Sequence, residues 1–164
     1  MRTVCNSGPL IHLARAGYFE LLRLLFGRIV IPPAVYHEVV VRGRGQDGAR
    51  ELEGAAWILR RIPRRKDLIT ALGAFLALGE AEAIALASER RDTLLLIDEA
   101  QGRRVAERLG IPVRGSLGVL LQGYRSGHVT DLEGAIARMR ERGTWIDDEV
   151  VAAVLTAARE GGLP

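Results

Sequence analysis

The run TLLLI at Thr93–Ile97 constrains the fold more than any other stretch of the chain. Its apolar residues do not alternate with polar ones, which is typical of a parallel strand buried on both faces. Other short apolar runs are separated by segments with helical periodicity. Strands that alternate with helices predict a parallel sheet with helices on both faces. We therefore predict an α/β protein of three layers, α/β/α, with a mostly parallel central sheet of about five strands.

The expected elements follow from periodicity, prolines and glycines. Five short segments rich in apolar or β-branched residues are predicted strands: 2–6, 27–33, 57–62, 93–97 and 111–115. The predicted helices are 9–17, 18–26, a helix from Pro33 through Val40, 49–54, 68–78, 78–91, 103–109, 116–124, a helix that includes Ile136 and Met139, and a last helix from Asp147. Thr130 with Glu133 three residues later predicts a capping box before Ile136.

Length and composition narrow the class of protein. The chain has 164 residues, so we expect one domain spanning 1–164. Apolar residues make up 48% and charged residues 26%, which is ordinary for a soluble globular protein. No apolar run reaches the roughly 18 residues of a membrane span, and residues 1–3 lack the layout of a signal peptide. A lone Cys5 cannot form an internal disulfide, which favours a cytoplasmic setting.

Positive charge is modest overall and concentrated at one place. The formal net charge is +3 and the sequence pI is about 9.6, which permits contact with nucleic acid without establishing it. Four arginines and a lysine lie within residues 60–66. A solvated edge strand and turn explains this cluster somewhat better than a binding site does.

Polar residues follow two of the predicted strands directly. In open parallel sheets, sites form outside the carboxyl ends of the strands. Asn6 lies at such an end, and Asp98, followed by Glu99, lies at another. Each also has a structural alternative, since either could cap the helix that comes next.

Two predicted helices carry further acidic candidates. Glu38 lies beside an apolar stripe, and Glu80 lies in the first turn of its helix, where the helix dipole alone favours an acid. Glu82 is about 200° round the same helix from Glu80, so only one of the two faces a given site. A pocket of carboxylates costs free energy unless a cation sits among them. Oxygen ligands of this kind suit Mg²⁺ or Mn²⁺.

Several other chemistries lack their motifs. Cys5 and the histidines, which are His12, His37 and His128, show neither CxxC nor HExxH spacing, so zinc is disfavoured. The chain has no GxxxxGK[ST] and no GxSxG, which argues against a P-loop and a serine hydrolase.

The chain resembles the PIN-like (VapC-type) family, and within it a prokaryotic branch long described as a domain of unknown function. The resemblance covers nearly the whole chain in order. It is carried by VCNSGPLIHLARAG, IPPAVYHEVV, LGEAEAIALA, LLLIDEAQGRRVAERLGIPVRGSLGVLL and WIDDEVVAAVL. GEAEAIALA followed by LLLIDE and RVAERLGIPVRGSLGVL is specific to that branch, whereas the opening segment alone is weak.

The resemblance implies a metal-dependent nuclease, often the RNA-cleaving toxin of a toxin–antitoxin pair. By position, the four site residues of the family fall at Asn6, Glu38, Glu80 and Asp98. Glu80 is preferred to Glu82 because its distance to Asp98 fits the family pattern. Ser7 matches the small hydroxyl residue after the first acid, and Ser116 matches a polar residue near the pocket. Asn6 departs from the usual aspartate: its carbonyl can bind Mg²⁺, but it brings no charge and cannot act as a base.

The leading hypothesis is Mg²⁺- or Mn²⁺-dependent hydrolysis of RNA. Its catalytic acids, Glu38, Glu80 and Asp98, bind the ion directly or through water, and Asn6 is a neutral ligand. Arg103 and Arg104 either hold flanking phosphates, as Ser7 and Ser116 also could, or form the exposed face of a helix. The alternatives are a weak or inactive module that binds RNA or a protein, and a hydrolase of small phosphate esters. The resemblance also implies a homodimer and a small antitoxin partner. The apolar helices 68–78 and 116–124 could make these contacts or be core.

Overall fold

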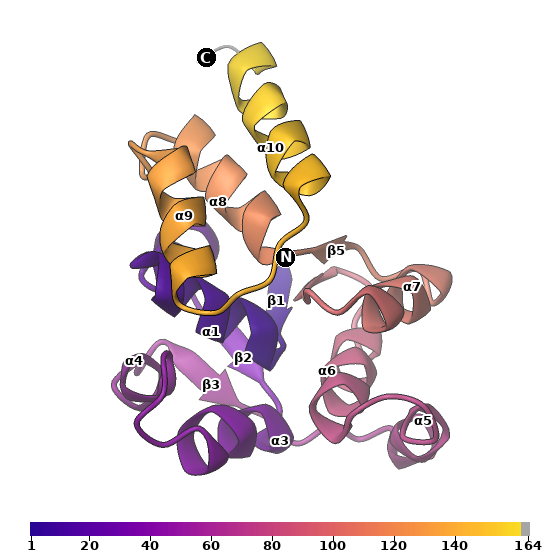
Figure 1. Ribbon diagram of the computed structural model, residues 1–164. Helices are drawn as coiled ribbons and strands as arrows, with labels where there is room; N and C mark the ends of the chain where they lie inside the picture. The colour runs from indigo at the N-terminus through magenta and orange to yellow at the C-terminus, as the bar shows by residue number, and fades with distance from the viewer. Residues whose placement is uncertain (162–164) are drawn as a thin grey trace.

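Five parallel strands form one sheet at the centre of the molecule (Figure 1). The computed structural model describes residues 1–161. In the order β3-β2-β1-β4-β5, the strands are Ile58–Arg60, Ile29–Ile31, Arg2–Cys5, Thr93–Leu96 and Val113–Arg114. All four neighbouring pairs are parallel. Helices pack on both faces of the sheet, so the predicted three-layer α/β/α fold is confirmed.

Ten α-helices and one π-helix are found in residues 1–161. One face of the sheet is covered mainly by α1 (Ser7–Ala16), α2 (Leu21–Phe26), α3 (Pro33–Tyr36), the π-helix η1 (His37–Arg42), α4 (Ala49–Glu53), α8 (Ser116–Arg125) and α9 (Leu132–Glu141). The other face is covered by α5 (Lys66–Leu72), α6 (Leu78–Ser88) and α7 (Ala100–Arg108). The last helix, α10 (Asp148–Glu160), packs against α8 and α9. None of these helices is long and apolar enough to cross a membrane.

Strand β4 is buried on both faces of the sheet, which explains why apolar and polar residues do not alternate in its sequence. Side chains of a strand point to opposite faces in turn. Leu94 and Leu96 therefore join the core on the α1 side, whereas Leu95 and Ile97 join the core on the α6 side. Because both faces are covered, the positions from Leu94 to Ile97 are all apolar.

Several predicted boundaries differ from the structure: for example, α2 begins at Leu21, three residues later than predicted, and α6 ends at Ser88, three residues earlier. The predicted helix 68–78 ends at Leu72, and Gly73, which is unfavourable inside a helix, begins the turn before α6. Helix α7 begins at Ala100, three residues earlier than predicted. The cap of α9 is Asp131, whose Oδ1 accepts a hydrogen bond from the backbone N–H of Gly134 at 2.8 Å, so the predicted capping role of Thr130 is wrong.

The parallel arrangement brings all strand ends of one kind to one edge. Cys5 pairs with Leu96, so the residues that follow β1 and β4 emerge side by side. The backbone N–H of Asn6 donates to Leu96 O at 2.9 Å and fixes this exit. Helix α8 begins just after β5 at the same edge.

Replacing Leu95 with alanine tests the double-sided burial of β4. Leu95 is fully buried, and truncation of such a leucine leaves a cavity that costs about 3 kcal/mol. Leu24→Ala is the control, because Leu24 is 54% exposed and should change stability by less than about 0.5 kcal/mol. Urea denaturation measures both, and equal small losses would contradict the buried central strand.

Candidate active site

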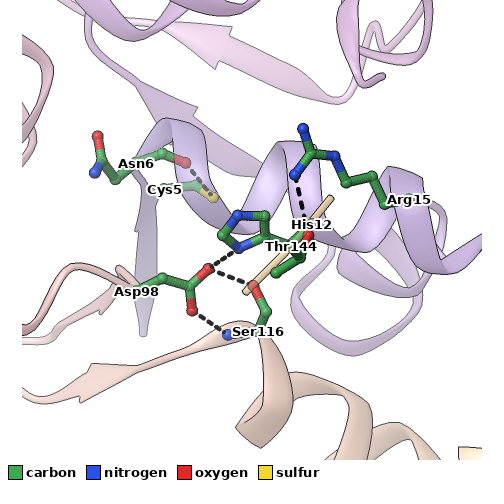
Figure 2. A network of polar contacts seen from close by, with 7 residues as sticks. All are labelled: Cys5, Asn6, His12, Arg15, Asp98, Ser116 and Thr144. Carbon is green, nitrogen blue, oxygen red and sulfur yellow. Dashed lines mark hydrogen bonds and ion pairs between the residues drawn. The ribbon is translucent and has the colours of Figure 1, made fainter. Parts of the chain in front are cut away.

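Asp98, at the end of β4, is the centre of a polar network that joins three elements (Figure 2). Its Oδ2 lies 2.7 Å from His12 Nδ1 on α1 and accepts a hydrogen bond from Ser116 Oγ at 2.5 Å. Its Oδ1 accepts from the backbone N–H of Ser116 at 2.7 Å. Asp98 therefore caps the start of α8, across the sheet edge, and does not cap α7, which follows it in the chain.

The network keeps Asp98 ionised although it is largely buried. Burial by itself raises the pKa of this carboxyl, but the hydrogen bond and charge of His12, with the two hydrogen bonds from Ser116, outweigh it. The net effect is a pKa below the ordinary aspartate value. Burial and then the charge of Asp98 raise the pKa of the neighbouring Cys5 thiol, which is fully buried and stays protonated.

Asn6 has a buried side-chain oxygen that the protein does not use. The residue is 2% exposed and stands at the N-cap position of α1, yet its side chain makes no capping hydrogen bond. Its Oδ1 is buried without a hydrogen-bond partner. Figure 2 shows the carboxamide pointing away from the Asp98 carboxylate. Since buried polar atoms are nearly always satisfied, this oxygen is suited to a ligand that the protein itself does not provide.

Glu38 approaches Asn6 across the backbone of Gly79. A Cβ at residue 79 would lie 2.9 Å from Glu38 Oε2 and 3.6 Å from Asn6 Oδ1, so both oxygens lie beside this glycine and a side chain there would displace Glu38. Glu38 lies in the π-helix η1, a geometry that often occurs at functional sites. The two oxygen donors predicted from the sequence thus border the same glycine.

Glu80 lies in the first turn of α6, beside α7. Its Oε1 is next to Gly102, where a Cβ would be only 2.7 Å away. Burial raises the pKa of Glu80, a hydrogen bond from the Ala77 backbone opposes this, and the negative charges of Glu99 and Glu38 raise it further. Three carboxylates therefore influence one another at this edge, which is the electrostatic situation that a cation relieves.

Glu82 has a structural task. Its Oε2 accepts a hydrogen bond from the backbone N–H of Ala34 at 3.0 Å, at the start of α3. This contact ties α6 to α3 and satisfies an N–H that has no partner within its own helix. The carboxylate of Glu82 is therefore already used.

The remaining predicted residues differ in position. Ser7 is buried at the first position of α1, and Ser116 is buried within the Asp98 network. Arg103 is half-buried on α7, and a Cβ on Gly115 would lie 2.9 Å from both its Nη1 and Asp98 Oδ1. Arg104 is exposed on the same helix.

The candidate residues thus form two neighbouring groups. One contains Asn6, Glu38 and Glu80, and the other contains Asp98 with its partners. In residues 1–161, no group of three or more His, Cys, Asp and Glu side chains is arranged to hold a metal ion. The donors that fit a hard cation best are the Asn6 carbonyl, which has no partner, and the carboxylates of Glu38 and Glu80.

Two clefts lie near these residues, and of the first group only Glu38 lines one of them, without Asn6 or Glu80. A cleft of about 530 Å³ is lined by Glu38, Gly79 and residues of α3 and α6. A second cleft, of about 420 Å³, is lined by His12, Asp98, Arg103 and Ser116. Trp145, which is 85% exposed, stands at the second cleft.

His12 is the site residue that sequence reasoning missed. On α1, Gly8 and His12 are four residues apart and so lie on one face of the helix. Asp98 Oδ2 lies against that face, since a Cβ on Gly8 would be 3.2 Å from it. The signal in the sequence is this helical spacing, but it has meaning only once β4 is known to end beside α1.

The fold and this edge define an α/β protein with a candidate cation site built from oxygen donors. The family model described as PIN domain matches residues 2–160, nearly the whole chain. The chain therefore belongs to the PIN domain family, in a branch formerly of unknown function, and the predicted resemblance is confirmed. Proteins of this family are generally nucleases that act on nucleic acids and typically use divalent metal ions, which supports a nuclease-like role. Comparison with curated proteins and with solved structures gives no match.

Removing the Ser116 hydroxyl tests the contribution of the network to stability. We expect Ser116→Ala to lower the free energy of unfolding by about 1.5 kcal/mol at neutral pH, because a hydrogen bond to a buried carboxylate is lost. The pKa of Asp98 is lower in the folded protein than its ordinary value of 3.8, so the network stabilises above that value. This stabilisation is lost as the pH falls through the lower, folded pKa.

Urea denaturation over a series of pH values measures the effect. The difference between wild type and Ser116→Ala should shrink in acid as Asp98 becomes protonated. Ser126→Ala is the matched control, since the Ser126 hydroxyl is exposed and donates only to Gln122 O at 2.9 Å. A difference for Ser116→Ala that does not depend on pH would contradict the assignment to the Asp98 carboxylate.

Proposed function

We propose that this protein is a Mg²⁺- or Mn²⁺-dependent endoribonuclease that hydrolyses RNA phosphodiester bonds at the carboxyl edge of its sheet. One observation carries the proposal: the buried Asn6 Oδ1 has no partner and lies beside Glu38 at Gly79. An amide oxygen next to carboxylates is a donor set for a hard divalent cation. Family membership supports the same class of chemistry.

Three residues would hold the cation: Asn6, Glu38 and Glu80. When bound, a divalent cation supplies Lewis acidity, which stabilises the charge that develops on a phosphoryl oxygen during hydrolysis. Glu38 and Glu80 bring two negative charges, whereas Asn6 brings only a dipole. We therefore propose a single cation, held more weakly than by an all-carboxylate set.

Asp98 is proposed as the third acid of the site. A carboxylate has about four acceptor positions, and His12 with Ser116 takes three of them. The position that remains is on Oδ1, which faces the space beside Gly115 and Arg103. In the proposed site, Asp98 accepts a proton or a ligand there while its orientation is fixed from the other side.

The cleft beside Asp98 is the proposed position of the substrate. Arg103 lines it and has the planar donor group that suits a phosphate. His12 is held through Nδ1, so its ring is oriented toward the same cleft. We propose that Arg103 holds the phosphate next to the scissile one. Arg104, exposed one position further, would contact a more distant phosphate, and Ser7 and Ser116 would shape the floor of the site.

The rival function is a PIN domain that binds RNA or a protein partner without cleaving. The observation that favours it is the engagement of Asp98, whose carboxylate faces His12 and Ser116 and not Asn6. Such a protein would retain an acidic edge without a complete cation site. Binding of RNA without turnover would select it.

Three finer proposals concern the setting of the protein. We propose that it acts in the cytoplasm, as the toxin of a toxin–antitoxin pair, and as a homodimer that a small antitoxin protein inhibits. Phe75 and Leu78, 52% and 59% exposed between α5 and α6, offer apolar surface for such contacts. The apolar residues Val119 and Leu120 of α8 are core, so that helix contributes little to an interface.

RNA cleavage is the first test. Purified protein is incubated with end-labelled single-stranded RNAs of mixed sequence, with Mg²⁺, with Mn²⁺ and with EDTA. We expect cleavage with metal and none with EDTA. Glu38→Gln, Glu80→Gln and Asp98→Asn should each lower the rate by about 100-fold or more, the scale seen when a group that stabilises transition-state charge is removed.

The control is Glu141→Gln, which removes an exposed carboxylate on α9 and should leave the rate unchanged. Circular dichroism checks that each variant is folded. If wild type cleaves no RNA with either metal and still binds RNA, the rival function is correct. Cleavage that persists in EDTA would rule out the proposed role of the cation.

The variant Asn6→Asp tests whether a charge at position 6 destabilises the protein without metal and strengthens its binding of a cation. Position 6 is nearly fully buried, so a carboxylate there should lower the melting temperature in EDTA. In excess Mn²⁺ the same variant should gain more stability than wild type, because binding to the folded state stabilises it. Differential scanning fluorimetry measures both values, with Asn6→Ala as the control that should gain least. Equal responses to Mn²⁺ in all three proteins would exclude residue 6 from the cation site.

A further inference from the structure

A basic cleft lies at the other end of α6 from Glu80. It has a volume of about 960 Å³ and is larger than either cleft at the candidate site. Its walls are the start of β1, the residues before β2, the segment after β3 and the C-terminal end of α6. The basic cluster noted in the sequence at residues 60–66 therefore lies beside arginines from distant parts of the chain.

Six arginines line the cleft: Arg2, Arg28, Arg61, Arg64, Arg65 and Arg90. Arg65 pairs with Asp67 at 3.6 Å, and within residues 1–161 the other five have no ion pair. Five of the six are exposed, and only Arg2 is half-buried. Guanidinium groups gathered without partners repel one another, which an anion in the cleft would relieve.

The two carboxylates of the cleft are already engaged. Asp92 pairs with the amino group of Met1 at 3.0 Å, and Glu89 accepts a hydrogen bond from the backbone N–H of Arg64. They offset only part of the positive charge. The cleft is therefore a concave, electropositive surface.

Arg2 shows that positive charge is in excess here. Its Nη2 donates to the Leu86 carbonyl, but its Nε is buried without a hydrogen-bond partner. Burial, and then the positive charge of Arg90, lower the pKa of Arg2, while Glu89 opposes the change. An unpartnered N–H donor beside a second cation is a position that suits a negatively charged oxygen.

We propose that this cleft binds the backbone phosphates of a single strand of RNA. The guanidinium group of arginine can donate two parallel hydrogen bonds to a phosphate. The arginines of the cleft come from several folded segments of the chain, and not from one flexible tail. Ile62, which also lines the cleft, is 70% exposed and offers an apolar side chain that an unstacked base can contact. A concave site with charged walls suits a strand better than it suits a flat anionic surface.

The inference extends the RNA part of the proposed function, on which the choice of RNA rests, but it does not require cleavage. Glu80 and Glu89 are nine residues apart, and Glu89 directly follows α6, so about 13 Å of helix separates the two sites. One strand could therefore contact both. The cleft would hold the strand at a distance from the bond that is cut, and so set affinity without touching the reacting atoms.

Binding is measured by fluorescence anisotropy with a labelled single-stranded RNA in EDTA, so that no cleavage occurs. The test variant is Arg61→Gln with Arg64→Gln in the full chain. We expect it to weaken binding about tenfold at low salt. The slope of log K against log salt should fall by about 1.4, since each lost phosphate contact accounts for about 0.7 on a single strand.

The matched control is Arg108→Gln with Arg159→Gln, which removes the same charge from exposed positions on α7 and α10 outside the cleft. It should keep the affinity within about twofold of wild type and change the slope little. Equal weakening by both double variants would overturn the proposal, because it would show only the effect of net charge. Displacement of the RNA by an acidic peptide at the same charge concentration would overturn the choice of RNA as the ligand.

The nuclease function and the RNA-binding cleft can be tested independently of each other. Glu80→Gln should lose cleavage in metal yet bind RNA like wild type in EDTA. Wild type that never cleaves, but binds RNA in a way that depends on Arg61 and Arg64, would reject the nuclease and retain the cleft. Normal cleavage with unaltered binding in the arginine variant would retain the nuclease and reject the cleft.

Discussion

The pairing of β1 with β4 is the constraint on which the candidate site depends. It runs in register from Arg2 opposite Thr93 to Cys5 opposite Leu96, so the chain leaves both strands at one level. Asn6 and Asp98 emerge there as neighbours although 92 positions separate them in the sequence. Helix α6 packs against both strands and brings Glu80 to the same edge. A shift of one residue would turn each side chain of β4 to the opposite face and change where Asp98 emerges relative to Asn6, so the site depends on this register.

Asp98 shows how this edge tolerates a buried charge. A carboxylate taken out of water needs hydrogen bonds or a cation. His12 and Ser116 provide the hydrogen bonds from two helices. Asp98 also caps the first turn of α8 by accepting from the backbone N–H of Ser116, and this contact helps to hold α8 beside the end of β4. It also limits the chemical role, because most acceptor positions of the carboxylate are already occupied.

The sequence predicted the layers, the parallel strands and the residues at the strand ends, because these follow from short-range patterns. Contacts between side chains of different elements were predicted less well, because they depend on how the helices pack. Glu38 and Glu80 could be placed on helices, but the approach of Glu38 to Asn6 at Gly79, and of Glu80 to Gly102, depends on how these helices pack. His12 could not be predicted as a site residue, because only the folded sheet brings it beside Asp98. Arg61 and Arg64 were interpreted as part of a solvated edge strand and turn. The arginines that complete the cleft are Arg2, Arg28 and Arg90, which are distant in sequence.

The neutral side chain of Asn6 has a physical reason in this arrangement. Burial raises the pKa of Glu80, and the negative charges of Glu99 and Glu38 raise it further. A fourth carboxylate, almost fully buried at position 6, would add repulsion and desolvation whenever no cation is present. A carboxamide keeps the oxygen donor and removes that cost, at the expense of cation affinity. On the proposed function, the same carboxamide would make the folded state less dependent on metal, so that RNA binding and cation binding would be separable.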